Sequence, residues 1–153
     1  TRCAESLKDT YEQIRLKMIT LGLIHCDETG SCVDGKTCWV HVASDQNYTY
    51  LTINQKSGQA GMDAANVLPH ANGIIMHDCW NSYWKYQNVT HAICCAHLLR
   101  ELNGVIENHP EQTWAVRFKK LLLDMKKVRD KALLLDKDEV SYYHRHKFDL
   151  QTV

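Results

Sequence analysis

The sequence predicts an α/β domain built on a mixed sheet, in which three antiparallel strands precede two parallel ones. Three short segments rich in β-branched and aromatic residues come first, joined by tight turns. Further apolar strand segments follow, and helical patterns separate them, as expected for strands joined by helical crossovers. At 153 residues the chain has the size of one domain, and its 44% hydrophobic and 24% charged residues are an ordinary globular composition.

An amphipathic helix is predicted ahead of the sheet, over residues 5–21. Its apolar residues alternate steps of four and three along one face: Leu7, Tyr11, Ile14, Met18 and Leu21. Gly22 then supplies the C-terminal stop. Such a helix packs on its own domain or forms a short coiled coil for self-association, and we favour packing.

Three antiparallel strands are predicted next. The first covers residues 23–27, and the pair Asp34–Gly35 favours a tight turn into the second, residues 37–43. A polar cluster at residues 44–47 turns the chain into the third strand, residues 48–54. Links this short join antiparallel neighbours.

Helices and strands alternate in the rest of the chain. The predicted elements are a short helix (60–67), a strand (74–78), a helical turn (80–86), a strand (91–95) and two helices (96–107 and 113–135). After the leading helix the order is strand-strand-strand-helix-strand-helix-strand-helix. This order is the ribonuclease-H-like arrangement, in which the later strands lie parallel to the first.

Two aspartates each directly follow an apolar strand segment. Asp27 lies at the end of the first predicted strand and Asp78 at the end of the fourth, each directly after apolar residues. If these strands are parallel neighbours about 4.8 Å apart, both carboxylates reach one pair of metal ions. Two cations held roughly 3.5–4 Å apart stabilise the attacking and leaving oxygens of a phosphodiester, and magnesium prefers such oxygen ligands. A single aspartate there is more often a turn former or a helix cap, so the prediction depends on the pair.

Three strings give the chain a specific resemblance. They are HCDETG at residues 25–30, HDCWNSY at residues 77–83 and CCAHLLREL at residues 94–102. Together, in this order and at about this spacing, they resemble transposases of the insertion-sequence-66 family. The resemblance covers most of the chain, from about Leu7 to the basic helix.

The resemblance implies a polynucleotidyl transferase with a ribonuclease-H-like core and a DDE triad of acids. Such an enzyme cleaves phosphodiesters at the ends of a mobile element and transfers the strands to target DNA. Asp27 matches the first acid and Asp78 the second. The third is a glutamate in an Asn-Asn-x-x-Glu-Arg-like string, which does not occur in these residues. We therefore expect two Mg²⁺ or Mn²⁺ ions only with the complete triad.

The missing string leads us to expect a partial catalytic domain of a longer protein, inactive by itself. We expect a leading helix (1–22), a ribonuclease-H-like core (23–109) and a truncated helical insertion (110–153). The parent protein is expected to bind DNA, as element ends and target, and to form a homo-oligomer.

Several residues are expected to support the two acids. Glu28 is a candidate for orienting Asp27. Cys94 and His97 resemble a Cys-x-x-His signature that several DDE families carry between their second and third acids, with an orienting or a structural role. Arg100, one turn after His97, is a candidate phosphate contact. The alternative is that Cys94 is a buried strand residue and His97 a helix start.

Two aromatic residues and a basic helix are further candidates for contacts with DNA. Trp80 and Tyr83 either stack on bases or fill the core, and we interpret both as core. Residues 113–131 hold 7 Lys and Arg against 2 Asp and Glu, whereas residues 1–112 hold 8 against 12. The helix either tracks a DNA backbone or presents a solvated face. Its candidate DNA-binding residues are Lys119, Lys120, Lys126 and Lys127.

Composition also bears on location and on alternative functions. Seven cysteines, an odd number, favour a reducing cytoplasm, and the family resemblance implies a bacterial one. No apolar stretch approaches the roughly 18 residues of a membrane helix. One alternative is a non-catalytic DNA-binding or assembly remnant, because Ser57 and Cys79 depart from the arginine and glycine of the family pattern. Another is a zinc-stabilised domain that uses Cys94 and His97.

Overall fold

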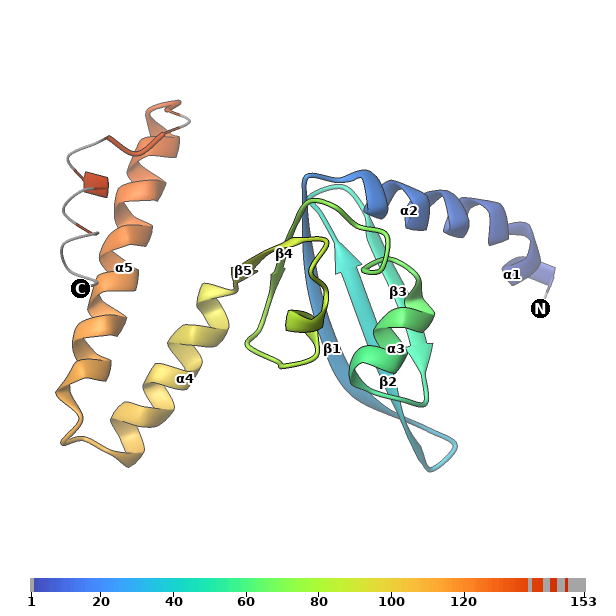
Figure 1. The fold of residues 1–153 in the computed structure, drawn as a ribbon, viewed down its shortest axis with the longest axis horizontal. Coiled ribbons are helices and arrows are strands. Elements are labelled where there is room, and N and C mark those ends of the chain that lie inside the picture. The colour runs from blue at the N-terminus through green and yellow to red at the C-terminus, as the bar shows by residue number, and fades with distance from the viewer. Residues whose placement is uncertain (1, 138, 142–143, 146–147, 149–153) are drawn as a thin grey trace. The chain divides into compact units, whose positions relative to one another are not determined.

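The structure is a computed structural model, and it describes residues 2–137, 139–141, 144–145 and 148. The chain forms two compact units, residues 1–94 and residues 95–153 (Figure 1). The first unit contains the sheet, and the second contains two long helices. The division expected from the sequence is a different one, into a leading helix, a core and a helical insertion with boundaries at residues 22/23 and 109/110. It stays a prediction.

The sheet of the first unit has the predicted topology. Its strands lie in the order β3-β2-β1-β4-β5. They are β1 (Leu23–Val33), β2 (Lys36–Ser44), β3 (Thr49–Asn54), β4 (Ile74–His77) and β5 (Thr90–Ile93). The first three pair antiparallel, β4 pairs parallel with β1, and β5 pairs parallel with β4. This confirms the ribonuclease-H-like mixed sheet.

Strand β1 continues six residues beyond its predicted end, because it forms a long hairpin with β2. Val33 pairs with Lys36, and Asp34 (φ +50°) and Gly35 (φ +73°) form the two-residue loop between them. Two positive φ angles fit the primed turns whose twist matches a hairpin. Asp27 therefore lies inside β1, and the prediction that it ends a strand was wrong.

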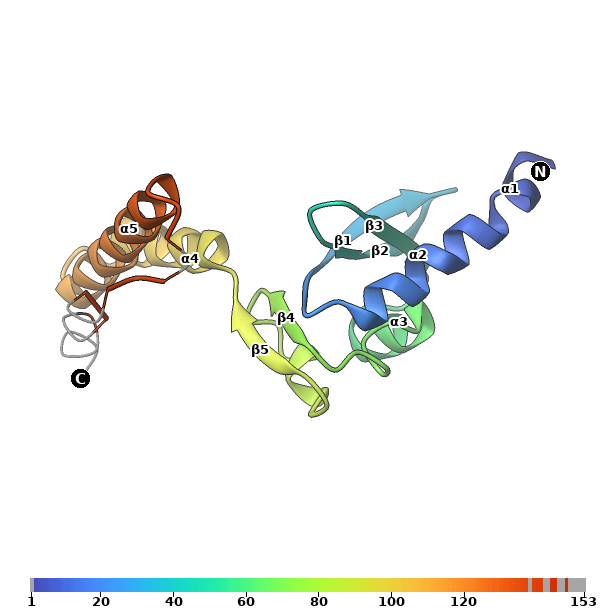
Figure 2. The same cartoon turned by 90° about the horizontal axis from the view of Figure 1, so that it is seen from above.

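The helices of the first unit cover one face of the sheet. They are α2 (Lys8–Thr20), α3 (Gly58–Ala65) and the 3-10 turn η1 (Tyr83–Lys85), whereas the short α1 (Arg2–Ser6) is exposed and contacts α2. Figure 2 shows α2 and α3 on the same side of strands β1 to β3. Met18 of α2 and Met62 of α3 share one buried core with Ile24 of β1 and Ile75 of β4.

The other face of the sheet, on the Asp27 side of β1, is exposed. Along β1 the buried residues Ile24 and Cys26 alternate with the exposed residues Leu23, His25 and Asp27. Successive side chains of a strand point to opposite faces. The alternation therefore directs Asp27 away from the core.

The second unit is a pair of helices, α4 (Cys95–Asn108) and α5 (Thr113–Leu134), that pack on each other. Leu102 of α4 and Leu121 of α5 are buried. Trp114 and Phe118 of α5 are 49% and 38% exposed. Among the described residues, no helix combines the length and apolar character needed to cross a membrane.

Candidate metal-binding site

The parallel pairing of β1 with β4 brings the two predicted acids to the same part of the sheet. His25 pairs with Met76 in this register. Two residues further along each segment come Asp27 and Asp78, so the continued register sets them side by side. Paired residues of neighbouring strands point to the same face, and the strands are about 4.8 Å apart. The pairing itself ends at His25 and Met76, so the closeness of the two carboxylates stays a prediction.

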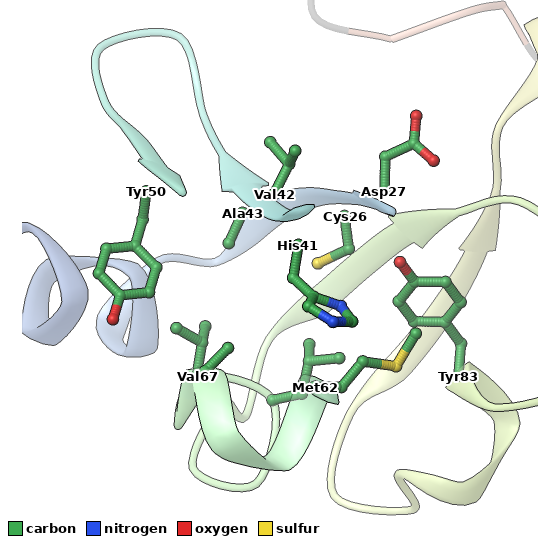
Figure 3. Close-up of a pocket in the computed structure, with 11 residues that line it drawn as sticks. Cys26, Asp27, His41, Val42, Ala43, Tyr50, Met62, Val67 and Tyr83 are labelled. Atoms are coloured by element: carbon green, nitrogen blue, oxygen red, sulfur yellow. The ribbon is translucent and has the colours of Figure 1, made fainter. Parts of the chain in front are cut away.

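Asp27 is held by its own strand. It pairs with Val42 of β2, and its Oδ1 accepts the backbone N–H of Glu28 at 2.9 Å. Figure 3 shows its carboxylate pointing away from the side chains of Cys26 and His41. The Asp27 side chain is thus on the open face of the sheet, and its charge stays in contact with solvent.

Asp78 is held by the turn that follows β4. Its Oδ1 accepts the backbone N–H of Trp80 at 2.9 Å, an interaction typical of aspartates that begin turns. The Oδ2 atoms of Asp27 and Asp78 accept no hydrogen bond in the part of the chain that the structure describes. Each aspartate therefore keeps one oxygen for a ligand, and carboxylate oxygens are ligands that Mg²⁺ prefers.

The buried Tyr83 lies near both aspartates. Burial first, and then the charges of Cys26, Asp78, Glu28 and Asp27, raise the pKa of its hydroxyl. The ring is 2% exposed and stacks on His77, with centroids 4.5 Å apart. Tyr83 is thus a neutral core residue beneath the site, which confirms that part of the prediction.

Trp80 was predicted to be a core residue, and that prediction was wrong. The residue is 48% exposed and lies in the turn that follows β4. Its indole Nε1 donates to Ser82 Oγ at 3.0 Å. The ring is therefore anchored at one edge although much of it remains exposed.

Glu28 lies on the opposite face from Asp27 and forms a buried polar pair with His41. The two side chains are 7% and 6% exposed, and Glu28 Oε2 is 3.4 Å from His41 Nδ1. The same Oε2 accepts the N–H of Gly58, the first residue of α3, at 3.1 Å. An anionic group is stabilised at a helix N-terminus. Glu28 thus ties β1 to β2 and α3 on the covered face, and its role in orienting Asp27 stays a prediction.

His41 was missed in the sequence. It lies between Val40 and Val42, and strand alternation places it on the covered face. Its Nε2 is 3.3 Å from the carbonyl oxygen of Lys56. The signal was a histidine that lies opposite an acidic residue of the neighbouring strand. It can be recognised only when the pairing register of β1 and β2 is known.

A small cavity of about 20 Å³ lies on the covered side of the sheet, and it has room for about one water molecule. Cys26, His41, Met62, Val67 and Tyr83 are among its lining residues (Figure 3). Burial, with a smaller effect of the Asp27 charge, raises the pKa of the Cys26 thiol to about 12. The cavity is mostly apolar, and the Asp27 carboxylate points away from it.

The predicted supporting residues Cys94, His97 and Arg100 are divided between the two units. Cys94 ends the first unit, and its N–H donates to the carbonyl oxygen of His77 at 2.8 Å. His97 and Arg100 are on α4 of the second unit. Their role at the site stays a prediction. Across the described ranges, no three His, Cys, Asp or Glu residues gather to hold a metal ion.

The candidate DNA-binding lysines are on α5, and three of them form ion pairs within it. Lys120 and Lys127 contact Asp124 at 2.7 Å and 3.8 Å, and Lys126 contacts Asp130 at 2.5 Å. Lys119 is half-buried. Exposed pairs of this kind contribute little to stability. The lysines can therefore exchange these partners for phosphates at small cost.

The chain is similar to several known proteins. The family model described as "Transposase IS66 family" matches residues 1–152. Two similar solved structures are of the HTLV-2 integrase catalytic core domain in complex with magnesium. The dimeric form is 14% identical with a TM-score of 0.40, over 59% of this chain and 74% of that one. The trimeric form is 13% identical with a TM-score of 0.39, over 57% and 73%.

A third similar structure is a simian T-cell lymphotropic virus intasome in complex with the PP2A regulatory subunit B56 gamma. It is 12% identical with a TM-score of 0.40, over 57% of this chain and 42% of that one. No curated protein matches the chain.

Proposed function

Because the chain belongs to the IS66 family of transposases, we propose that Asp27 and Asp78 are two of the metal-binding acids of a DDE catalytic site. In the parent protein this site cleaves phosphodiesters at the ends of a mobile element and transfers the DNA strands. The enzyme is thus a metal-dependent polynucleotidyl transferase that acts on DNA, as element ends and target, and works as a homo-oligomer in the bacterial cytoplasm.

The parallel register of β1 and β4 is the observation that carries the proposal. If it continues two residues beyond the pair His25 and Met76, Asp27 and Asp78 are neighbours, which supports the proposal. Both residues also keep Oδ2 without a hydrogen bond among the described residues. Two adjacent carboxylates without a cation repel each other, so a divalent ion between them removes an unfavourable interaction.

Magnesium or manganese is the cofactor that fits these donors. When bound, such ions stabilise the charge that develops on the attacking and leaving oxygens of a phosphodiester. Asp27 and Asp78 hold the ions, and the bonds from the N–H groups of Glu28 and Trp80 orient the two carboxylates. The third acid of the family pattern is absent from these residues. Both ions are therefore expected only with the complete triad.

Glu28 acts as a positioning residue behind the site, and Cys94, His97 and Arg100 support it from the chain after β5. The lysines of α5 contact DNA phosphates. For Glu28 the support is its buried contact with His41 and its bond to Gly58, which fix the strand on which Asp27 lies.

Manganese binding to the 153-residue protein tests the proposal. Mn²⁺ is paramagnetic, so at low occupancy it broadens the NMR signals of amides near its site. We expect the amides of Glu28 and Trp80 to broaden first, because each donates to one of the two aspartates. Asp78→Asn removes one charged ligand, and it should abolish the selective broadening at both amides.

Asp9→Asn is the matched control, because Asp9 is an exposed carboxylate in the first turn of α2. It should leave the broadening unchanged. Equal broadening in the Asp78→Asn variant would contradict the proposal. Absence of selective broadening in the unaltered protein would favour a non-catalytic DNA-binding or assembly role.

A further inference from the structure

Trp80 is an exposed aromatic residue immediately beside the second acid. It follows Asp78 by two residues and is 48% exposed. Its backbone N–H donates to Asp78 Oδ1 at 2.9 Å, so its position is fixed relative to that carboxylate. The exposed indole and the aspartate therefore belong to one rigid turn.

The indole ring is anchored at its polar edge. Nε1 donates to Ser82 Oγ at 3.0 Å. Gly58 packs closely behind, since a Cβ at this position would be 2.8 Å from Ser82 Oγ and 3.8 Å from Trp80 Nε1. An anchored ring loses little further freedom when a ligand binds to it, which favours binding.

The faces of the Trp80 ring are free of aromatic partners in the described residues. Trp84 offers a comparison in the same unit, because it is also exposed, at 46%. Its ring, however, lies against His91 with centroids 4.7 Å apart, and against His77 at 5.2 Å. Of these two exposed tryptophans beside the site, Trp80 is thus the one with faces available to a flat ligand.

We infer that Trp80 stacks on a nucleobase of the DNA strand whose phosphates occupy the site at Asp27 and Asp78, an inference that rests on the proposed function. Bases stack on exposed aromatic rings with little dependence on sequence. Residues 1–94 carry seven Lys and Arg against nine Asp and Glu. Phosphate attraction by this unit is therefore weak, and stacking supplies a contact that does not depend on cationic side chains.

Binding of a fluorescein-labelled single-stranded oligonucleotide, followed by anisotropy in the presence of Mn²⁺, tests the inference. Loss of one stacked base weakens binding by roughly 5- to 150-fold. Trp80→Ala and Trp80→Leu should both show this loss, because neither side chain is aromatic. Trp80→Phe should retain most of the affinity, because a smaller ring still stacks.

Trp114→Ala is the matched control. Trp114 is 49% exposed, and its Nε1 also donates to a side chain two residues away, Gln112 Oε1 at 2.7 Å. It belongs to the second unit. We expect its replacement to leave the affinity unchanged. Equal losses for Trp80→Ala and Trp114→Ala would overturn the inference.

Abasic nucleotides identify the stacked base and separate stacking from a folding defect. In the unaltered protein, removing the base at one position of the strand should weaken binding as much as Trp80→Ala does. In the Trp80→Ala protein the same abasic position should cost nothing further, because the two changes remove one contact. Additive losses at every position, or no binding of the oligonucleotide by the unaltered protein, would overturn the inference.

The Mn²⁺ broadening described above distinguishes this inference from the proposed function. Trp80→Ala keeps the backbone N–H that donates to Asp78, so the variant should bind Mn²⁺ as the unaltered protein does. Coupling between Trp80 and one base without selective Mn²⁺ binding would support stacking and contradict the metal site. Selective Mn²⁺ binding without such coupling would overturn the stacking alone.

Discussion

Glu28 Oε2 lies 3.4 Å from His41 Nδ1, and the two residues are directly paired on neighbouring strands, both buried. The carboxylate also accepts the N–H of Gly58 at the start of α3. Strands β1 and β2 and helix α3 thus meet at one polar contact, and β1 is the strand that carries Asp27. Buried charged groups are costly unless paired, so each partner depends on the other.

Glu28→Ala is expected to destabilise the first unit by about 1–3 kcal/mol, because it leaves the buried N–H of Gly58 without its acceptor and His41 without its polar neighbour. Urea unfolding followed by tryptophan fluorescence measures this loss. Glu12→Ala removes an exposed acid that pairs with Arg15, and it should leave the urea unfolding midpoint nearly unchanged. Similar effects of the two substitutions would contradict a role for the buried pair.

Glycine to alanine is expected to have opposite effects in two helices. At Gly61 of α3 a Cβ would collide with the His41 ring and the Lys56 carbonyl, and overpacking of this kind costs about 1–3 kcal/mol. At Gly104 of α4 a Cβ meets nothing within 4 Å, and alanine should stabilise the helix by up to about 1 kcal/mol. Amide hydrogen exchange in each helix measures both effects. Stabilisation by Gly61→Ala would show that the helix is not pressed against His41.

Cys26 should resist alkylation at pH 8, whereas the exposed Cys79 reacts. Burial raises the pKa of the Cys26 thiol to about 12, and the thiolate is the reactive form. Mass spectrometry after iodoacetamide treatment in native buffer identifies the modified residues. In urea both residues should react, because unfolding removes the burial. Rapid native modification of Cys26 would contradict its placement in the core.

The raised pKa of Cys26 also predicts that the free energy of unfolding decreases at alkaline pH. Cys26 has a higher pKa in the folded state, so the unfolded chain releases its proton first, from about pH 9. The contribution of this thiol is complete below pH 9 and falls as the pH rises toward 12. Between pH 8 and pH 10, unfolding midpoints should fall less for Cys26→Ala than for the unaltered protein. Equal decreases of the unfolding midpoint in the two proteins would contradict a raised pKa of Cys26.

The lysines of α5 should set part of the salt dependence of DNA binding. Each lysine that contacts a phosphate contributes about 0.9 to the slope of log K against log salt concentration. The double substitution Lys126→Gln with Lys127→Gln should therefore reduce the slope by up to about 1.8. Lys8→Gln with Lys17→Gln, on α2, removes the same charge and should leave the slope unchanged. Equal slopes for both variants would indicate that the α5 lysines form a solvated face.

Much of the first unit could be predicted because its signals are local. Asp34 and Gly35 are residue types that adopt the positive φ angles of a two-residue hairpin loop. The strands on either side of the loop are recognisable from their β-branched and aromatic residues. Two aspartates after apolar segments indicated the site for the same reason. The end of β1 was misplaced because the strand continues through pairing with β2, and pairing partners are not visible in one segment alone.

The sequence by itself determined the order of the strands and helices, the hairpin at residues 34–35 and the choice of Asp27 and Asp78 as the candidate acids. These follow from periodicity and turn chemistry, which act over a few residues. Only the tertiary structure decided that Glu28 pairs with His41 and that Trp80 is exposed. The physical reason is that strand alternation separates the two faces of a sheet, whereas the packing of α2, α3 and η1 selects which face is buried.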